Sequence, residues 1–240
     1  MQPHSLPTAP DRPAAPVRRP ASDSPLYIAP RQGEFLCDVT VLFDEHGHVY
    51  YEDERPEDRD VDNILWERWG GVASGPVAMA HHHPVRQREV MDAALKCAVC
   101  KDEPDCDDRG VLWLLHVDDT TRATLTFPTD ITTATPAVCA KDAVRALEAC
   151  QVLQRGFIAV RVREAEIIGV RGTVYSPTAS PLLDQDVRLD DDRIHRVVAR
   201  QLLRQLRNAE LDETTLSTAG LPARTGAGGC PVDVPGPAWG

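Results

Sequence analysis

The sequence predicts an α+β fold in which a small cysteine-containing module is joined to a small antiparallel sheet and a C-terminal helix. Two β-like runs, at residues 157–163 and 166–175, predict adjacent antiparallel strands with a turn near Ala165. A helical pattern covers residues 192–211, and the aspartates at its start are well placed to cap free backbone amides. Residues 97–100 form a Cys-x-x-Cys pair. These three observations define the expected fold class.

The acidic composition limits the possible partners. The chain has 240 residues, of which 37 are acidic and 26 are basic, so its formal net charge is −11. This balance disfavours a protein whose whole surface binds nucleic acid or anionic lipid. No apolar run reaches the roughly 18 residues of a membrane helix, and the first residues lack the order of a secretory signal peptide. Seven cysteines, an odd number, favour metal binding in a reducing compartment. We therefore expect a cytoplasmic protein with no membrane partner.

Four segments differ in composition. Residues 1–33 hold eight prolines and few large apolar residues, and residues 213–240 are rich in Gly, Pro and Ala. Such stretches bury too little surface to offset chain entropy, so we expect both ends to be disordered. Residues 34–80 form an acidic N-terminal segment with a predicted hairpin, and residues 81–212 form the predicted metal-binding α+β domain.

Apolar periodicity and turn residues predict the remaining elements. Trp66 is expected to pack on the core, because a tryptophan is costly to leave in water. The expected elements are a strand over 35–43, a turn at 44–47, a return strand at 48–51, a helix from 84 to 95, an apolar strand at 111–115 and a helix that opens at 139–142.

The strongest chemical signal is the pair formed by Cys97 and Cys100. A tight turn between two cysteines brings both sulfurs to one side, where they can hold one Zn²⁺ ion. Further along, Cys139 opens a helix, where free amides and the helix dipole stabilise a thiolate. A zinc knuckle, a hairpin and then a helix that returns further ligands is the order of a treble-clef-like module. The alternative is that these cysteines are small buried apolar residues.

Two residues compete for the fourth ligand position. Asp142 lies three residues after Cys139, hence on the same helix face, but its carboxylate is a harder and less typical ligand for structural zinc. Cys106 offers a thiolate, which suits zinc better. The chain has only three lysines, each adjacent to one of the proposed cysteine ligands, and their charge would offset that of an anionic zinc centre: Lys96, Lys101 and Lys141.

Over residues 50–208 the chain resembles a family of uncharacterised actinobacterial Cys-x-x-Cys proteins. The residues that carry the resemblance are 85–88, Cys97 with Cys100, 110–115, Pro136, 138–139, 160–163, 169–170 and Tyr175. The resemblance implies a second cysteine pair at Cys139 and at the position of Asp142. This chain departs from the family there, and it has Cys106 where the family has none. A compensating exchange of ligands would explain both changes, whereas loss of the metal would explain only the first. The family brings no known reaction with it.

Five arginines recur three or four residues apart along the predicted C-terminal helix: Arg193, Arg196, Arg200, Arg204 and Arg207. On a helix they would line one face, which could bind the phosphates of a nucleic acid. The alternatives are a solvated face or an intramolecular partner for the acidic segment. Aromatic residues that could stack on bases are missing beside the arginines, which weakens the case for a surface that binds single-stranded nucleic acid.

These features favour a non-catalytic protein that is stabilised by one structural zinc ion and acts on a protein partner as an interaction or regulatory module. One alternative is a nucleic-acid-binding regulator that uses the arginine helix. The other is a treble-clef metal-dependent nuclease with His116 as general base. Such a nuclease needs further ligands around a catalytic metal, and we assign no catalytic residue. The histidine run at 81–83 is interpreted as an exposed linker.

Overall fold

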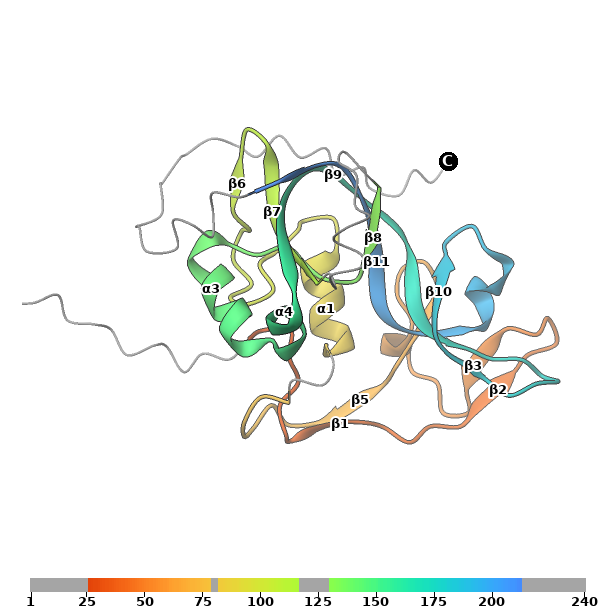
Figure 1. Ribbon diagram of the computed structural model, residues 1–240. Coiled ribbons are helices and arrows are strands. Elements are labelled where there is room, and N and C mark those ends of the chain that lie inside the picture. The colour runs from red at the N-terminus through yellow and green to blue at the C-terminus, as the bar shows by residue number, and fades with distance from the viewer. Residues whose placement is uncertain (1–25, 79–81, 117–129, 213–240) are drawn as a thin grey trace, which may run out of the picture.

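The computed structural model describes residues 26–78, 82–116 and 130–212, and it confirms a mixed α+β fold (Figure 1). Within these residues, one seven-stranded sheet is accompanied by two two-stranded sheets. No helix in this part of the chain is long and apolar enough to cross a membrane. The α-helices are α1 (Pro84–Met91), α3 (Ala140–Ala149) and α4 (Gln151–Arg155).

Two long antiparallel strands form the centre of the large sheet. β9 (Phe157–Val174) pairs with β11 (Val197–Leu211) along almost its whole length. On its other side, β9 pairs with β7 (Gly110–His116) and then with β10 (Leu182–Arg188). The other side of β11 holds two short strands, β4 (Leu65–Trp66) and β8 (Ile131–Thr133). The positions of these four strands therefore depend on the β9–β11 pair.

The two strands expected at 157–163 and 166–175 are one continuous strand, β9. The prediction of a turn near Ala165 is wrong, because Ala165 is completely buried and pairs with Leu206 of β11. Arg163 remains inside the strand with its side chain 53% exposed. A polar residue here marks the solvent face of a strand rather than its end.

The predicted C-terminal helix over 192–211 is also wrong. Only Asp192–Arg196 is helical, as the short 3-10 helix η2, and its N-cap Asp191 accepts a hydrogen bond from the Arg193 N–H at 2.8 Å. The rest of the segment is β11. The arginine spacing fitted a helix, but pairing with β9 and burial of Val197 and Val198 outweigh that local preference.

Gly169 and Gly172 allow β9 to bend. The register between β9 and β11 shifts next to each of these glycines. A Cβ on either glycine would lie 2.2 Å from a backbone carbonyl oxygen, that of Val187 or that of Val198. No side chain fits at that distance, so glycine is required there. Glycines and bulges together let the strand pair curl, and Figure 1 shows the resulting arch of β9.

Two buried polar side chains attach α1 to β11. Gln87 accepts a hydrogen bond from the Leu202 N–H at 2.9 Å and donates to the Leu202 carbonyl at 3.0 Å. It thus takes the place of a neighbouring strand between β4 and β8. Arg204 donates at 2.8 Å to the carbonyls of Met91 and Asp92, at the C-terminal end of α1. Those carbonyls have no partner inside the helix, so Arg204 satisfies them.

The acidic segment folds into two small sheets. The predicted hairpin is confirmed as β2 paired with β3, but the strand expected over 35–43 is interrupted and its first residues form β1, which pairs with β5. Trp66 is buried, as expected. The elements of this segment outside the large sheet are β1 (Glu34–Leu36), β2 (Val41–Phe43), β3 (Val49–Tyr51), η1 (Pro56–Asp58) and β5 (Trp69–Gly71).

Part of the N-terminal tail is folded, so the prediction of disorder is wrong for residues 26–33. Ile28 and Ala29 are buried, and the N–H groups of Tyr27 and Ile28 donate to the carbonyls of Val99 and Ala98 at 3.0 and 3.2 Å. The other residues predicted to be disordered, 1–25 and 213–240, lie outside the described residues.

We expect Gly172→Ala to lower the free energy of unfolding by about 2–4 kcal/mol, because the added methyl group would overlap the Val198 carbonyl oxygen. Urea unfolding measures the change. Arg163→Ala, on the exposed face of the same strand, is the control and should change the value by no more than about 0.5 kcal/mol. Parent-like stability of Gly172→Ala would contradict the close approach.

Gln87→Leu should also destabilise the chain by about 2–4 kcal/mol, because it leaves the Leu202 N–H and two buried carbonyls without partners. Val85→Ala, on the exposed side of α1, is the matched control. Equal unfolding midpoints for the two variants would show that Gln87 does not attach α1 to the sheet.

Candidate metal centre

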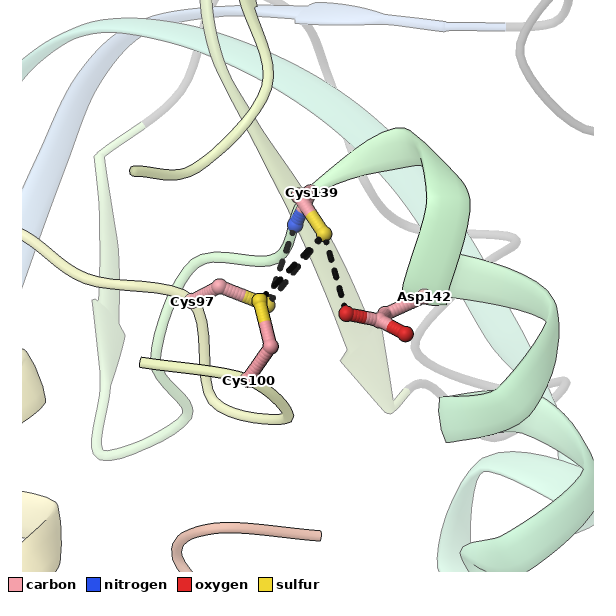
Figure 2. A group of neighbouring side chains, drawn as sticks. All are labelled: Cys97, Cys100, Cys139 and Asp142. Atoms are coloured by element: carbon pink, nitrogen blue, oxygen red, sulfur yellow. Dashed lines mark hydrogen bonds between the residues drawn. The ribbon is translucent and has the colours of Figure 1, made fainter. Parts of the chain in front are cut away.

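Four side chains from two distant parts of the chain meet at the N-terminal end of α3. Cys97 and Cys100 come from the turn that precedes β6 (Cys106–Asp107), Cys139 is the N-cap of α3, and Asp142 lies in its first turn. Their ligand atoms all lie within 4.8 Å of one another. Figure 2 shows the sulfurs and the carboxylate facing one another. Among the described residues this is the one such group, and it could hold a metal ion.

Cys139 lies at the centre of the group. Its Sγ is 3.6 Å from the Cys97 Sγ, 3.8 Å from the Cys100 Sγ and 3.2 Å from the Asp142 Oδ2. Cys97, Cys139 and Asp142 are buried, whereas Cys100 is partly exposed. Cys100 is therefore the member of the group that is most accessible to solvent.

Backbone hydrogen bonds shape the knuckle that carries the first two cysteines. The Cys97 N–H donates to the Asp102 carbonyl at 2.7 Å, and the Lys101 N–H donates to the Cys97 carbonyl at 3.0 Å. Lys101 has a φ of 64°, which closes the turn. Two further N–H groups, of Val99 and Cys139, donate to the Cys97 Sγ at 3.4 and 3.3 Å. Such bonds favour a thiolate at Cys97.

An extended segment before α3 brings Cys139 to the knuckle. The Ala98 N–H donates to the Ala137 carbonyl at 2.9 Å, and the Asp105 N–H donates to the Val138 carbonyl at 3.0 Å. The Val138 N–H in turn donates to Leu112 of β7 at 3.1 Å. The segment is therefore bonded to both the knuckle and the sheet, and this places cysteines 42 residues apart in contact.

The four groups do not share one ionisation behaviour. Hydrogen bonding with the Cys139 thiol lowers the pKa of Cys97 to about 6, against the effect of burial. Burial raises the pKa of Cys100 to about 12, and hydrogen bonding with Cys97 together with burial raises that of Cys139. Burial acts to raise the pKa of Asp142, but hydrogen bonds from Cys100, Cys139 and Arg145 outweigh it and leave the pKa below its usual value. Hydrogen bonding thus favours the charged forms of Cys97 and Asp142.

The cation that touches the group is Arg145. Its Nη1 donates to the Asp142 Oδ1 at 3.0 Å, so the Oδ2 remains directed at the sulfurs. Arg145 was not among the predicted site residues, although its position three residues after Asp142 on one helix was a usable signal. Two of the three lysines contact other carboxylates: Lys101 pairs with Glu89 at 2.8 Å and Lys141 with Asp102 at 2.9 Å.

The other candidate ligand, Cys106, is not a member of the group. It lies on β6, where it pairs with Val111 of β7. The structure therefore brings Asp142, and not Cys106, to the three cysteines.

The five arginines do not form one face. Arg204 is completely buried, and Arg193 and Arg196 belong to η2 rather than to β11. Arg200 Nε pairs with Glu67 of the acidic segment at 2.8 Å, and Arg207 Nη1 pairs with Glu166 at 2.9 Å. The continuous phosphate-binding stripe expected on a helix is absent from the described residues, because a strand separates these side chains.

The histidines proposed for other roles lie apart from the metal group. His116 is exposed at the end of β7 and pairs with Phe157 of β9. His83 is buried, with its ring centroid 5.1 Å from that of Trp69, so the expectation of an exposed linker is wrong at this residue. His82 is partly buried, and His81 lies outside the described residues.

Comparison of the chain with protein-family models, with curated proteins and with solved structures gave no match. The resemblance to actinobacterial proteins stays a prediction. The geometry of the metal group is therefore the main basis for a functional proposal.

We expect Arg145→Gln to weaken metal binding by about 10-fold to 100-fold, because the Asp142 carboxylate would lose the partner that orients it. Competition between the protein and a chromophoric chelator for Zn²⁺ measures the affinity. Arg155→Gln removes an exposed arginine from α4 and is the control. Equal affinities in the two variants would remove Arg145 from the site.

Proposed function

We propose that the protein is a non-catalytic zinc protein in which Cys97, Cys100, Cys139 and Asp142 hold one structural Zn²⁺ ion. The folded domain would act as an interaction or regulatory module for a protein partner. The observation that carries the proposal is the convergence of three sulfurs and one carboxylate oxygen within 4.8 Å.

The spacing of the ligand atoms supports one tetrahedral ion. With Zn–S bonds of about 2.3 Å, two sulfurs of a tetrahedral site lie about 3.8 Å apart, and the separations from Cys139 are 3.6 and 3.8 Å. With a Zn–O bond of about 2.0 Å, the sulfur–oxygen separation would be about 3.5 Å, near the 3.2 Å between Cys139 and Asp142. Thiolate ligands favour zinc over magnesium, calcium or manganese.

The order of elements supports a treble-clef-like arrangement. The knuckle at Cys97 and Cys100 is followed by the hairpin of β6 and β7, and α3 returns Cys139 and Asp142 at its N-terminal end. Zinc there would join the knuckle to the helix. This would fasten two parts of the chain that otherwise meet through a few backbone hydrogen bonds.

A structural role follows from the number of protein ligands. Catalytic zinc sites keep a position for water or substrate, whereas four protein ligands fill a tetrahedral site. The net charge of −11 and the pairing of Arg200 and Arg207 with carboxylates favour a protein partner over nucleic acid.

Elemental analysis of the purified full-length chain tests the proposal. We expect one zinc per chain in the parent, little in Cys97→Ser and Cys139→Ser, and weaker retention in Asp142→Ala. A chelator should lower the unfolding midpoint of the parent, because metal binding stabilises the folded state.

Two cysteines outside the group supply controls. Cys37→Ser and Cys150→Ser should retain zinc like the parent, since both residues carry free thiols. Loss of zinc from Cys106→Ser with full retention in Asp142→Ala would reassign the fourth ligand. A parent chain without stoichiometric zinc, when produced in zinc-replete medium, would refute the proposal.

A further inference from the structure

Three histidine rings gather on the surface, far along the chain from the cysteine group. His46 and His48 lie in the turn of the β2–β3 hairpin, and His195 lies in η2. The ring centroid of His48 is 5.8 Å from that of His46 and 4.6 Å from that of His195. Figure 1 shows the hairpin beside the segment that connects β10 to β11.

Apolar packing beneath the rings holds the segments that carry His48 and His195 side by side. Val49 and Tyr51 of β3 are almost completely buried and pack with Leu65 of β4 and Val198 of β11. His48 directly precedes β3, and His195 precedes β11 by two residues. The core contact therefore brings imidazoles together from segments about 150 residues apart.

The spacing of the His48 ring from its two neighbours suits a shared metal ion. An imidazole bound through nitrogen at about 2.0–2.1 Å places its ring centroid about 3.2 Å from the metal, so two rings at tetrahedral positions have centroids about 5.2 Å apart. The observed separations of 4.6 and 5.8 Å lie on either side of this value. Among the described residues only the cysteine group already has converged ligand atoms, so these rings must turn to close on an ion. The His46 and His48 side chains are 70% and 45% exposed, which leaves them room to turn.

A carboxylate lies beside the central ring. The Asp44 Oδ2 lies 3.6 Å from the His48 Nδ1, on the side that leaves the Nε2 available. The Asp44 Oδ1 accepts hydrogen bonds from the backbone N–H groups of His46 and His48 at 2.9 and 2.8 Å, which holds the turn in shape. A carboxylate that accepts a hydrogen bond from one ring nitrogen directs the other nitrogen of a metal-binding histidine toward the ion, and a small turn of the His48 ring would close this 3.6 Å approach.

We propose that His46, His48 and His195 form a second metal site, which binds a divalent transition ion of the class that prefers imidazole, such as Zn²⁺, Cu²⁺ or Ni²⁺. The site is independent of the cysteine group in both position and ligand type. An ion held there would link the hairpin to η2.

Calorimetric titration of the full-length chain with Ni²⁺ tests the site, with one equivalent of zinc added first to fill any thiolate site. The parent should show a binding event that His195→Ala and His48→Ala weaken by at least about 10-fold. Asp44→Asn keeps an acceptor for the two N–H groups but removes the charge, and it should weaken binding by about 10-fold. His116→Ala, which removes an exposed histidine elsewhere, is the control and should bind like the parent.

A second readout separates this site from the histidine run at 81–83. Ni²⁺ that links the hairpin to η2 should raise the unfolding midpoint of the parent but not that of His195→Ala. Parent-like affinity and stoichiometry in His195→Ala would overturn the proposal and assign the binding to other histidines. A midpoint that Ni²⁺ raises equally in both chains would overturn it as well.

Discussion

The antiparallel pairing of β9 with β11 is the interaction on which the rest of the structure depends. It runs from the pair Val197–Val174 to the pair Leu211–Val160, and each edge of this strand pair carries further strands. A long segment of chain separates the two strands and must close before their ladder of hydrogen bonds can form. The pairing is therefore non-local and cooperative. The bends at Gly169 and Gly172 then determine where the flanking strands and α1 can lie.

Buried polar groups connect this strand pair to its surroundings. Arg204 is an unusual core residue, because it is completely buried and has backbone carbonyls as hydrogen-bond partners. Burial lowers its pKa to about 10, which still leaves the guanidinium charged near neutral pH. With Gln87, it gives α1 one defined position on β11. A purely apolar contact would leave the helix freer to slide, since apolar packing is not directional.

The cysteine group lies where three backbone segments are bonded into one unit: the knuckle, the extended residues before α3, and β7. Backbone hydrogen bonds set the distance between these segments, and the side chains then converge with separations that suit a single ion. Hydrogen bonds within the group favour the charged forms of Cys97 and Asp142, and Arg145 lies against the carboxylate. A cation would thus enter a largely preformed set of ligands, at the partly exposed side near Cys100.

The sequence by itself determined the local features of this protein. The Cys-x-x-Cys turn, the thiol at the start of α3 and the β2–β3 hairpin all depend on residues close together in the chain. Only the tertiary structure decided whether Cys106 or Asp142 would join the group, because that choice depends on which strand each neighbouring segment pairs with. Long-range strand pairing also explains the largest error of the sequence-based prediction, which is the helix expected over residues 192–211. Arginines spaced three or four apart are compatible with a helix. The long partner strand β9 instead supplies hydrogen-bond partners for the backbone groups of this segment, and Val197, Val198 and Arg204 are buried.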